Sequence, residues 1–410
     1  MANKNVVIFA IVAVVLIQIA TIVSHWPDVK AEKPDFAALY GTAREFHGGE
    51  KPDYDATKIA GVDEAAEPSG PASATAPQTR KIDLLHPPFE ALLFYPLAFL
   101  PYRAAYLVWF AINLVLLWLV PKILWGYLPR LQIEFQYIAI AFGTGLPVLA
   151  SLTFGQDSIL LLLLITLSYV SLEKGNLLRA GMFLGLCMFK FQVVLPIVLC
   201  MAIARRWKLI AGFLGTLCVM ILVTVGVMGP AVCARYIPFI FRFTSHISAE
   251  NSDRTGMMPN LRGLLSFLLD SHASKLAISA IVIAMSVLVV VAVWRSSEES
   301  LGENQIAVEF STYVIAATLV SYHLYVYNSV VLLLPLLLIA NEFADPRIPR
   351  IFRYGFAVAA INLYIAPSMV SLRISMPISA GATVLLFGLV ILYRARQNES
   401  RAKNLALENY

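Results

Sequence analysis

Charged residues are scarce in this sequence. Only 14% of its 410 residues are Asp, Glu, Lys or Arg, against about 25% in a soluble domain, while 59% are hydrophobic. Long apolar runs recur along the whole chain, which indicates one membrane domain. The composition excludes a soluble protein with a membrane tether. It predicts an all-α polytopic membrane protein with one membrane domain over residues 1–410.

Several functional patterns are also missing. The four cysteines lie in or beside apolar runs and are far apart in the sequence: Cys187, Cys200, Cys218 and Cys233. Such spacing gives neither a zinc site nor a disulfide framework. Basic residues form no stripe with interleaved aromatics, so nucleic acid is not an expected partner. We find no internal repeat, which weighs against transporters built from paired halves.

The apolar runs predict ten membrane crossings. The run from Val6 to Val23 has no small-x-small cleavage site after it, which is typical of a retained signal anchor. Basic residues gather in alternate loops, and the positive-inside rule places these loops in the cytoplasm. Both termini are then cytoplasmic, with a tail over 395–410. The predicted crossings are 5–23, 104–124, 135–151, 157–172, 207–229, 272–294, 306–322, 328–342, 352–366 and 377–394.

One apolar segment is predicted to enter the membrane without crossing it. If 180–204 crossed, the basic residues Arg205 and Arg206 would lie outside and every later loop would oppose the charge rule. We therefore expect a re-entrant hairpin with its tip near Lys190. Irregular backbone at that depth is tolerated only beside protein or a water-filled cavity, which makes the tip a candidate cavity wall.

Two long segments are predicted to lie outside the cytoplasm. The first covers 24–103, and its part 65–79 has a composition typical of disorder. The second covers 230–271 and ends in an amphipathic stretch over 261–269, which fits a helix in the plane of the membrane interface. Short cytoplasmic loops show no nucleotide-sugar machinery.

Asp35 is the predicted catalytic base. It follows Pro34 about ten residues after the first apolar run. A carboxylate is unusual so close to a membrane segment, because apolar side chains dominate wherever lipid is the solvent. A loop Asp behind a proline is also typical of a turn or a helix N-cap. The catalytic interpretation is favoured by other polar residues that the same topology places outside: Tyr40, Tyr54, Asp55, His86, Gln156, Lys190, Arg254, Arg262, His323 and Asn328.

Each of these residues has a structural alternative. Lys190 sits in an apolar context and fits a side chain that snorkels to the interface. His323 fits an aromatic belt, and Asp157 fits the N-cap of its span. His86 precedes two prolines and fits a rigid corner, while 53–55 fit a surface turn.

Taken together, the outer residues suit transfer from a lipid phosphate. A carboxylate accepts the proton of the acceptor hydroxyl, and Asp35 supplies it. Cations hold the departing phosphate, a role that suits Lys190, Arg254 and Arg262. Sugar or phosphate oxygens find hydrogen-bond partners in Gln156, His323 and Asn328. Aromatic rings such as Tyr40 and Tyr54 suit stacking on a sugar face, and Asp55 and His86 are assigned to the acceptor side.

The order of these motifs resembles glycosyltransferase family 87. The resemblance covers roughly 30–335 and rests on Pro34-Asp35-Phe36 with Tyr40, Tyr54-Asp55, His86-Pro87-Pro88-Phe89, Tyr95-Pro96-Leu97, Gly155-Gln156-Asp157-Ser158, Gly181 to Lys190, Asn260-Leu261-Arg262-Gly263, Ser321-Tyr322-His323 and Tyr327-Asn328. It implies a GT-C enzyme that uses a polyprenyl-phosphate sugar outside the cytoplasm, with inversion and Asp35 as base. The family often has Asp where this chain has Asn328.

The sequence therefore predicts a hexosyltransferase of the inner (plasma) membrane. The donor is a polyprenyl-phosphate sugar such as the mannose derivative, and the acceptor is a lipid or glycan. The site is expected to need no cofactor, although Asp35 and the carboxylates at 53 and 55 leave a divalent metal open. The alternatives are a transporter or translocase of lipid-linked sugars, and an inactive scaffold that binds them.

Overall fold

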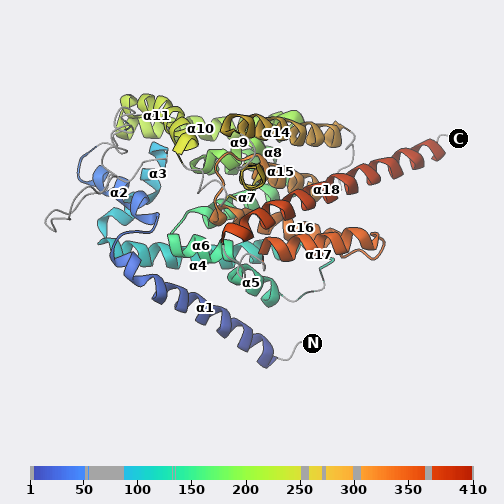
Figure 1. Cartoon of the computed structure of the whole chain (residues 1–410), viewed down its shortest axis with the longest axis horizontal. Helices are drawn as coiled ribbons and strands as arrows, with labels where there is room; N and C mark the ends of the chain where they lie inside the picture. Colours follow the sequence, from blue (N-terminus) through green and yellow to red (C-terminus); the bar gives the residue numbers. More distant parts are fainter. Residues whose placement is uncertain are drawn as a thin grey trace. The chain divides into compact units, whose positions relative to one another are not determined.

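The computed structural model describes residues 4–50, 54, 87–131, 133, 135–250, 258–269, 274–298, 306–364 and 372–408. Within these residues every regular element is helical, which confirms the all-α prediction. The elements (Figure 1) are α1 Lys4–Lys30, α2 Phe36–His47, α3 Pro88–Phe94, η1 Tyr95–Phe99, α4 Tyr102–Leu124, η2 Trp125–Tyr127, α5 Phe135–Thr144, α6 Leu146–Phe154, α7 Ser158–Glu173, α8 Leu177–Leu186, η3 Cys187–Lys190, α9 Phe191–Ile203, α10 Trp207–Met228, α11 Pro230–Glu250, α13 Leu261–Leu269, α14 Lys275–Glu298, α15 Ile306–Val320, η5 Val326–Leu332, α16 Leu333–Phe343, α17 Arg350–Tyr364 and α18 Leu372–Glu408.

Length and apolar composition allow fewer crossings than the ten predicted. In the described residues, seven helical stretches pass both criteria, or eight if the pair α5 and α6, bent by 62°, counts as one span. The predicted spans at 157–172, 306–322 and 352–366 are the short helices α7, α15 and α17, with 16, 15 and 15 residues. A helix of 16 residues rises only about 24 Å, less than the roughly 30 Å of hydrocarbon in a bilayer.

The predicted hairpin at 180–204 corresponds to α8, η3 and α9, and its re-entry into the membrane stays a prediction. Residues 177–203 are long and apolar enough for a span, but a straight helix would put Leu209 about 40 Å from Gly181. Instead, a methyl group added at Gly181 would overlap the carbonyl oxygen of Leu209, and one at Gly212 would overlap that of Leu178. The start of α10 therefore lies beside the start of α8, so the chain reverses at η3.

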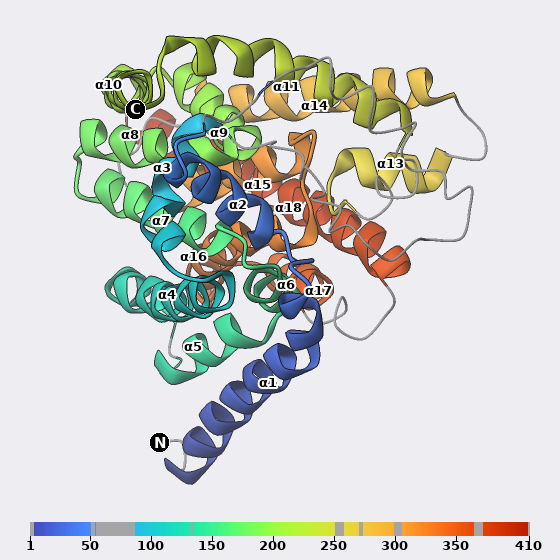
Figure 2. The same cartoon turned by 90° about the vertical axis from the view of Figure 1, so that its left-hand side faces the viewer.

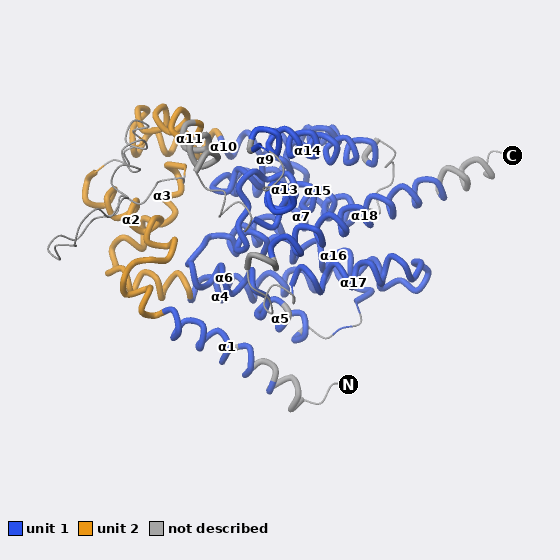
Figure 3. Tube along the Cα trace, viewed as in Figure 1, with its two compact units in different colours: residues 1–25, 111–217, 253–410 blue, residues 26–110, 218–252 orange. Residues whose placement is uncertain are grey.

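The chain groups into two compact units (Figure 3). Unit 1 comprises 1–25, 111–217 and 253–410, and unit 2 comprises 26–110 and 218–252. Most of unit 2 comes from the two segments predicted to lie outside the membrane. The helices α1, α4 and α10 each contribute residues to both units.

Unit 1 is built around the short buried helices α7 and α15. The hydroxyl of Ser168 on α7 donates to the carbonyl oxygen of Ala180 on α8 at 3.0 Å. Tyr169 near the end of α7 packs on Phe310 near the start of α15, with ring centroids 5.8 Å apart. Helix α15 also packs against α9, α16 and α18, and α13 lies beside α14 and α18 (Figure 2). Short helices fit here because protein rather than lipid surrounds them.

Unit 2 is held together by aromatic side chains. Phe36 at the start of α2 is fully buried and contacts the rings of Tyr40, Tyr102 and Tyr106 at centroid distances of 6.0, 5.7 and 5.7 Å. These interlocking contacts fix the first turn of α2, and Asp35 immediately precedes that turn.

Candidate functional site

The turn between α6 and α7 presents two buried polar side chains. Gly155 ends α6 in the left-handed region at φ +63°, a conformation that glycine adopts without strain. Gln156 and Asp157 follow it with exposed fractions of 2% and 0%. Asp157 precedes α7, but its side chain makes no capping hydrogen bond. Asp157 therefore takes the N-cap position that the structural alternative expects, although its carboxylate does not cap the helix.

Lys190 at the tip of the hairpin meets this turn. Its Nζ lies 2.8 Å from Oδ1 of Asp157 and donates to Oε1 of Gln156 at 3.1 Å. The ammonium also lies 6.0 Å from the centroid of the Tyr327 ring. With 5% of its side chain exposed, Lys190 does not snorkel to an interface. The structure thus brings Lys190 together with Gln156 and Asp157, which precede it by 34 and 33 positions in the sequence.

Asn328 joins the same polar set from the segment between α15 and α16. It is buried, and its Oδ1 accepts a hydrogen bond of 2.8 Å from Oγ of Ser158, the first residue of α7. Tyr327 beside it packs on Tyr325 at a centroid distance of 5.8 Å. The predicted residues Gln156, Lys190 and Asn328 therefore share one polar cluster, which we call the tip cluster together with Asp157 and Ser158.

Arg262 is positioned by the start of α13. Asn260 caps this helix, because its Oδ1 accepts from the backbone N–H of Gly263 at 2.8 Å. The Nδ2 of Asn260 also donates to the carbonyl oxygen of Ser321 at 2.7 Å. These two bonds fasten α13 to the segment that follows α15. The guanidinium of Arg262 then stacks on Tyr322, with its Cζ 4.0 Å from the ring centroid.

The electrostatics of Arg262 are those of an anion site. Its side chain is 8% exposed, and its Nη1 contacts the carbonyl oxygen of Tyr322 at 3.4 Å. No carboxylate of the described residues lies within ion-pair distance of it. Burial lowers the pKa of Arg262, although an arginine keeps its charge in proteins. A buried positive charge of this kind favours an anionic ligand.

His323 lies next to Arg262. Its ring packs edge-on against Tyr322 at a centroid distance of 4.7 Å. Burial, helped by the positive charge of Arg262, lowers the pKa of His323 to about 4, so the imidazole is neutral at physiological pH. Its buried Nε2 has no hydrogen-bond partner among the described residues. We call Arg262, Tyr322 and His323 the arginine cluster.

Asp35 belongs to unit 2 and sits at the N-cap position of α2. This position is the one that the structural alternative expects, although its half-buried side chain makes no capping hydrogen bond. The structure leaves its catalytic role as a prediction. Tyr40 lies one turn further along α2, and its hydroxyl donates to the carbonyl oxygen of Leu100 at 2.7 Å.

Tyr54 is buried in unit 2. Its ring lies 5.1 Å from that of Tyr236 and 5.4 Å from that of Phe239, and burial raises the pKa of its hydroxyl. Its predicted contact with the acceptor stays a prediction. The predicted residues Asp55, His86 and Arg254 lie outside the described part of the chain.

The sequence analysis missed Asp157 and Ser158 as members of the tip cluster. A signal was present, because a lysine in the apolar run 187–191 needs a nearby carboxylate if it is buried. The sequence does not say which carboxylate meets it. In the described residues no group of three or more His, Cys, Asp or Glu side chains is placed to hold a metal ion.

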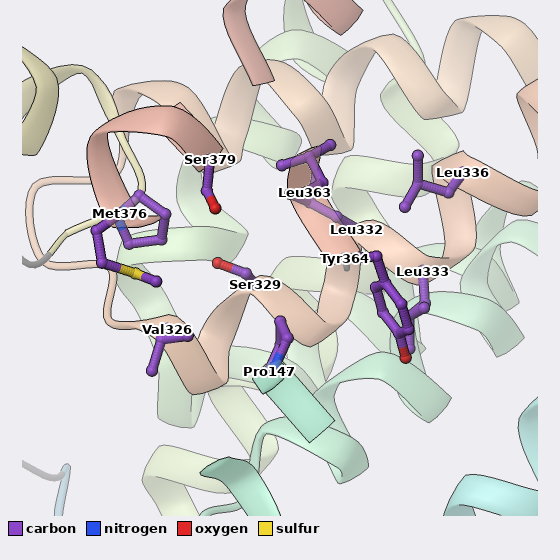
Figure 4. A pocket seen from close by; sticks show the side chains of 11 residues that line it. Pro147, Val326, Ser329, Leu332, Leu333, Leu336, Leu363, Tyr364, Met376 and Ser379 are labelled. Atoms are coloured by element: carbon purple, nitrogen blue, oxygen red, sulfur yellow. The ribbon is translucent and has the colours of Figure 1, made fainter. Parts of the chain in front are cut away.

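A largely apolar pocket begins next to the tip cluster. Its lining includes Ser329, the residue after Asn328, together with Pro147 and Met376. Figure 4 shows the hydroxyls of Ser329 and Ser379 pointing toward one another across it. The Oγ of Ser329 is buried without a hydrogen-bond partner among the described residues. The segment 321–329 thus connects the arginine cluster, the tip cluster and an apolar cavity.

Comparison with known proteins identifies the family of the chain. No curated protein and no solved structure matches the chain. The model of glycosyltransferase family 87 matches residues 84–322, which is more than half of the 410 residues. The matched region includes Gln156, Lys190 and Arg262. The chain therefore belongs to glycosyltransferase family 87, whose members transfer sugars.

Proposed function

We propose that this membrane glycosyltransferase transfers a hexose such as mannose from a polyprenyl-phosphate donor to a lipid or glycan acceptor on the extracytoplasmic face. The observation that carries the proposal is Arg262, a buried arginine without a carboxylate partner among the described residues, beside the neutral His323. Together they offer a charge and an N–H group to a phosphate. A GT-C type of fold and an inner (plasma) membrane location belong to the same proposal.

Among the described residues, the charges of the tip cluster and the arginine cluster support a donor with a single negative charge. Lys190 and Asp157 neutralise each other at 2.8 Å, whereas Arg262 keeps one positive charge. A sugar linked to polyprenyl phosphate is a phosphodiester with one negative charge, which Arg262 balances. A diphosphate-linked sugar brings a second negative charge, and burying that charge without a positive partner is costly. The monophosphate donor is therefore favoured.

The reaction is a single displacement with inversion at the anomeric carbon. Asp35 takes the proton of the acceptor hydroxyl as its oxygen bonds to that carbon, and the bond from carbon to phosphate oxygen breaks. The leaving polyprenyl phosphate gains negative charge. Arg262 and the N–H of His323 stabilise that charge as it develops, which lowers the barrier. Lys190, Gln156 and Asn328 are assigned to oxygens of the donor.

The test is a donor panel with purified protein. We expect release of polyprenyl phosphate from polyprenyl-phosphate mannose in the presence of a membrane lipid extract, and no turnover with GDP-mannose or polyprenyl-diphosphate mannose. Asp35→Asn should lower the rate by about 10²–10⁴-fold, the usual share of a general base, while the protein stays folded. The matched control is Asp28→Asn, because Asp28 pairs with Lys33 near the surface. Full activity of Asp35→Asn, or transfer from GDP-mannose, would refute the proposal.

Family membership favours this enzyme over a transporter of lipid-linked sugars. A transporter would move the mannose derivative without breaking a bond. Formation of a new glycosidic bond in the donor panel therefore separates the two.

A further inference from the structure

We infer that Asp157 is a positioning residue of this glycosyltransferase, which holds the hairpin tip so that the arginine cluster keeps its shape. The inference rests on the proposed function for its link to the donor. Its basis is the buried ion pair in which Asp157 Oδ1 and Lys190 Nζ lie 2.8 Å apart, with side-chain exposed fractions of 0% and 5%.

The pair connects the turn between α6 and α7 with the tip of the hairpin. Asp157 lies between α6 and α7, while Lys190 ends η3, where its backbone leaves helical geometry at φ −118° and ψ 55°. Gln156 adds a second bond to the same ammonium at 3.1 Å. Because the chain reverses at the short 3₁₀ helix η3, these contacts with Lys190 fix the position of the hairpin tip.

The fixed tip is linked onward to the arginine cluster. Ser158, directly after Asp157, donates to Asn328 at 2.8 Å. Asn328 belongs to the same connecting segment as Tyr322 and His323, and Tyr322 supports Arg262. A shift of the α6–α7 turn is therefore transmitted through Asn328 to the residues that surround the proposed phosphate site.

Packing alone does not require an ion pair here. Removing two charges from water is costly, and apolar side chains of similar volume often stabilise a core as well or better. A buried pair does, however, fix geometry, because a charge tolerates displacement from its partner poorly in a low dielectric. A positional role for Asp157 accounts for a pair that stability alone would not favour.

The experiment separates position from stability with three variants. Asp157→Asn removes one charge, Lys190→Met removes the other, and Asp157→Asn with Lys190→Met leaves no buried charge unpaired. The full-length protein is purified in detergent, and its melting temperature and donor KM and kcat are measured. The rate at which diethylpyrocarbonate modifies His323, followed by peptide mass spectrometry, reports on the arginine cluster without any donor.

We expect Asp157→Asn to raise the modification rate of His323 and the donor KM by about tenfold each, with a smaller change in kcat. The double variant should regain the melting temperature of the wild type but keep both increases. Donor KM of the double variant does not decide, because Lys190 is itself assigned to the donor. If the double variant regains His323 protection together with the melting temperature, the pair is only structural and the inference is wrong. The double variant keeps the test decisive even if Asp157→Asn does not fold.

Arg206→Met is the matched control. Arg206 follows the other end of the hairpin and pairs with Glu309 at 3.3 Å. Its loss should lower the melting temperature and leave His323 reactivity and donor KM unchanged; equal effects of both ion pairs would overturn the inference. If the wild type uses no lipid-phosphate donor, the proposed function fails, yet the modification of His323 still decides whether Asp157 positions the cluster.

Discussion

His323 shows how a neighbour fixes the chemistry of a single residue. An ordinary histidine titrates near pH 6.5, so it would be partly charged during turnover. Beside the charged Arg262, and largely buried, His323 stays neutral because its pKa falls to about 4. A neutral imidazole has one N–H to donate and one nitrogen to accept, which suits contact with phosphate or sugar oxygens.

This lowered pKa predicts an acid-sensitive stability. The unfolded chain protonates His323 near pH 6.5, whereas the folded chain protonates it only near pH 4, so the stability falls as the pH drops between these values. His323→Asn removes this contribution. The melting temperature of the wild type relative to the variant should be constant above about pH 7.5 and should decrease between 6.5 and 4. Thermal unfolding in detergent across this range measures it.

The exposed His47 provides the background for that comparison, through His47→Asn. A difference between wild type and His323→Asn that does not vary with pH would contradict the assigned protonation state. An increase on acidification would also do so, because it requires a raised pKa rather than a lowered one.

Most residues of the two clusters could be picked out from sequence, but their partners could not. Lys190, Gln156 and Asn328 stand out as polar residues at the ends of apolar runs. Which of them touch depends on contacts such as that between Ser158 and Asn328, 170 positions apart. No local pattern encodes such a contact. Asp157 was therefore interpreted from its position alone, as a cap.

At the scale of elements, glycines determine how the hairpin fits against its neighbour. Gly181 and Gly185 on α8 and Gly212 on α10 lie where the two helices approach most closely. Small residues spaced four apart allow such close approach in membrane proteins. Because α8 and α10 run in the same direction from the same end, α9 must return between them.

Gly181→Ala is therefore expected to destabilise the protein. Its new methyl group would overlap the backbone of Leu209, and overpacking of this kind costs about 1–3 kcal/mol. Gly215→Ala is the matched control on α10, because nothing lies within 4 Å of a methyl group there. It should be neutral or should stabilise by up to about 1 kcal/mol through helix propensity. Unfolding free energies in detergent decide, and equal effects would contradict the close packing.

The positions of helices were more predictable than their roles. Each of the ten predicted spans overlaps a helix or a bent pair of helices, because apolar periodicity depends on local sequence. The helices α1 and α18 continue to Lys30 and Glu408, well past the predicted ends at 23 and 394. Helix α11 falls within a segment predicted only as an outer loop. Its residues Val232 and Phe239 are buried against Tyr54, and this tertiary packing is invisible in a hydropathy profile.

For the whole molecule, the sequence predicts one membrane domain, and this stays a prediction. The chain groups into two compact units from five segments. Hydropathy records which residues avoid water. It does not record which distant segments associate, and unit 1 alone joins residues before 26 with residues after 252. The candidate site in unit 1 accordingly draws on four separate stretches near 156, 190, 262 and 325.

The topology of the whole chain provides the last prediction. If 177–203 form a re-entrant hairpin, the loop before α8 and the loop after α9 lie on the same side of the membrane. We expect both to be cytoplasmic, because Lys174 and Lys208 belong to the basic loops. Lys174→Cys and Lys208→Cys in the full-length protein should resist a membrane-impermeant maleimide in intact cells and react after permeabilisation. Glu50→Cys, in the first predicted outer segment, should react in both cases.

The exposed positions of Lys174, Lys208 and Glu50 make these substitutions compatible with folding, and the wild type gives the background from its four native cysteines. Labelling of Lys174→Cys and Lys208→Cys from opposite sides would mean that 177–203 cross the bilayer. Every later loop would then lie on the opposite side of the membrane. The proposed extracytoplasmic location of the arginine cluster would therefore be wrong as well. The parity of one hairpin thus determines on which side of the membrane the sugar is transferred.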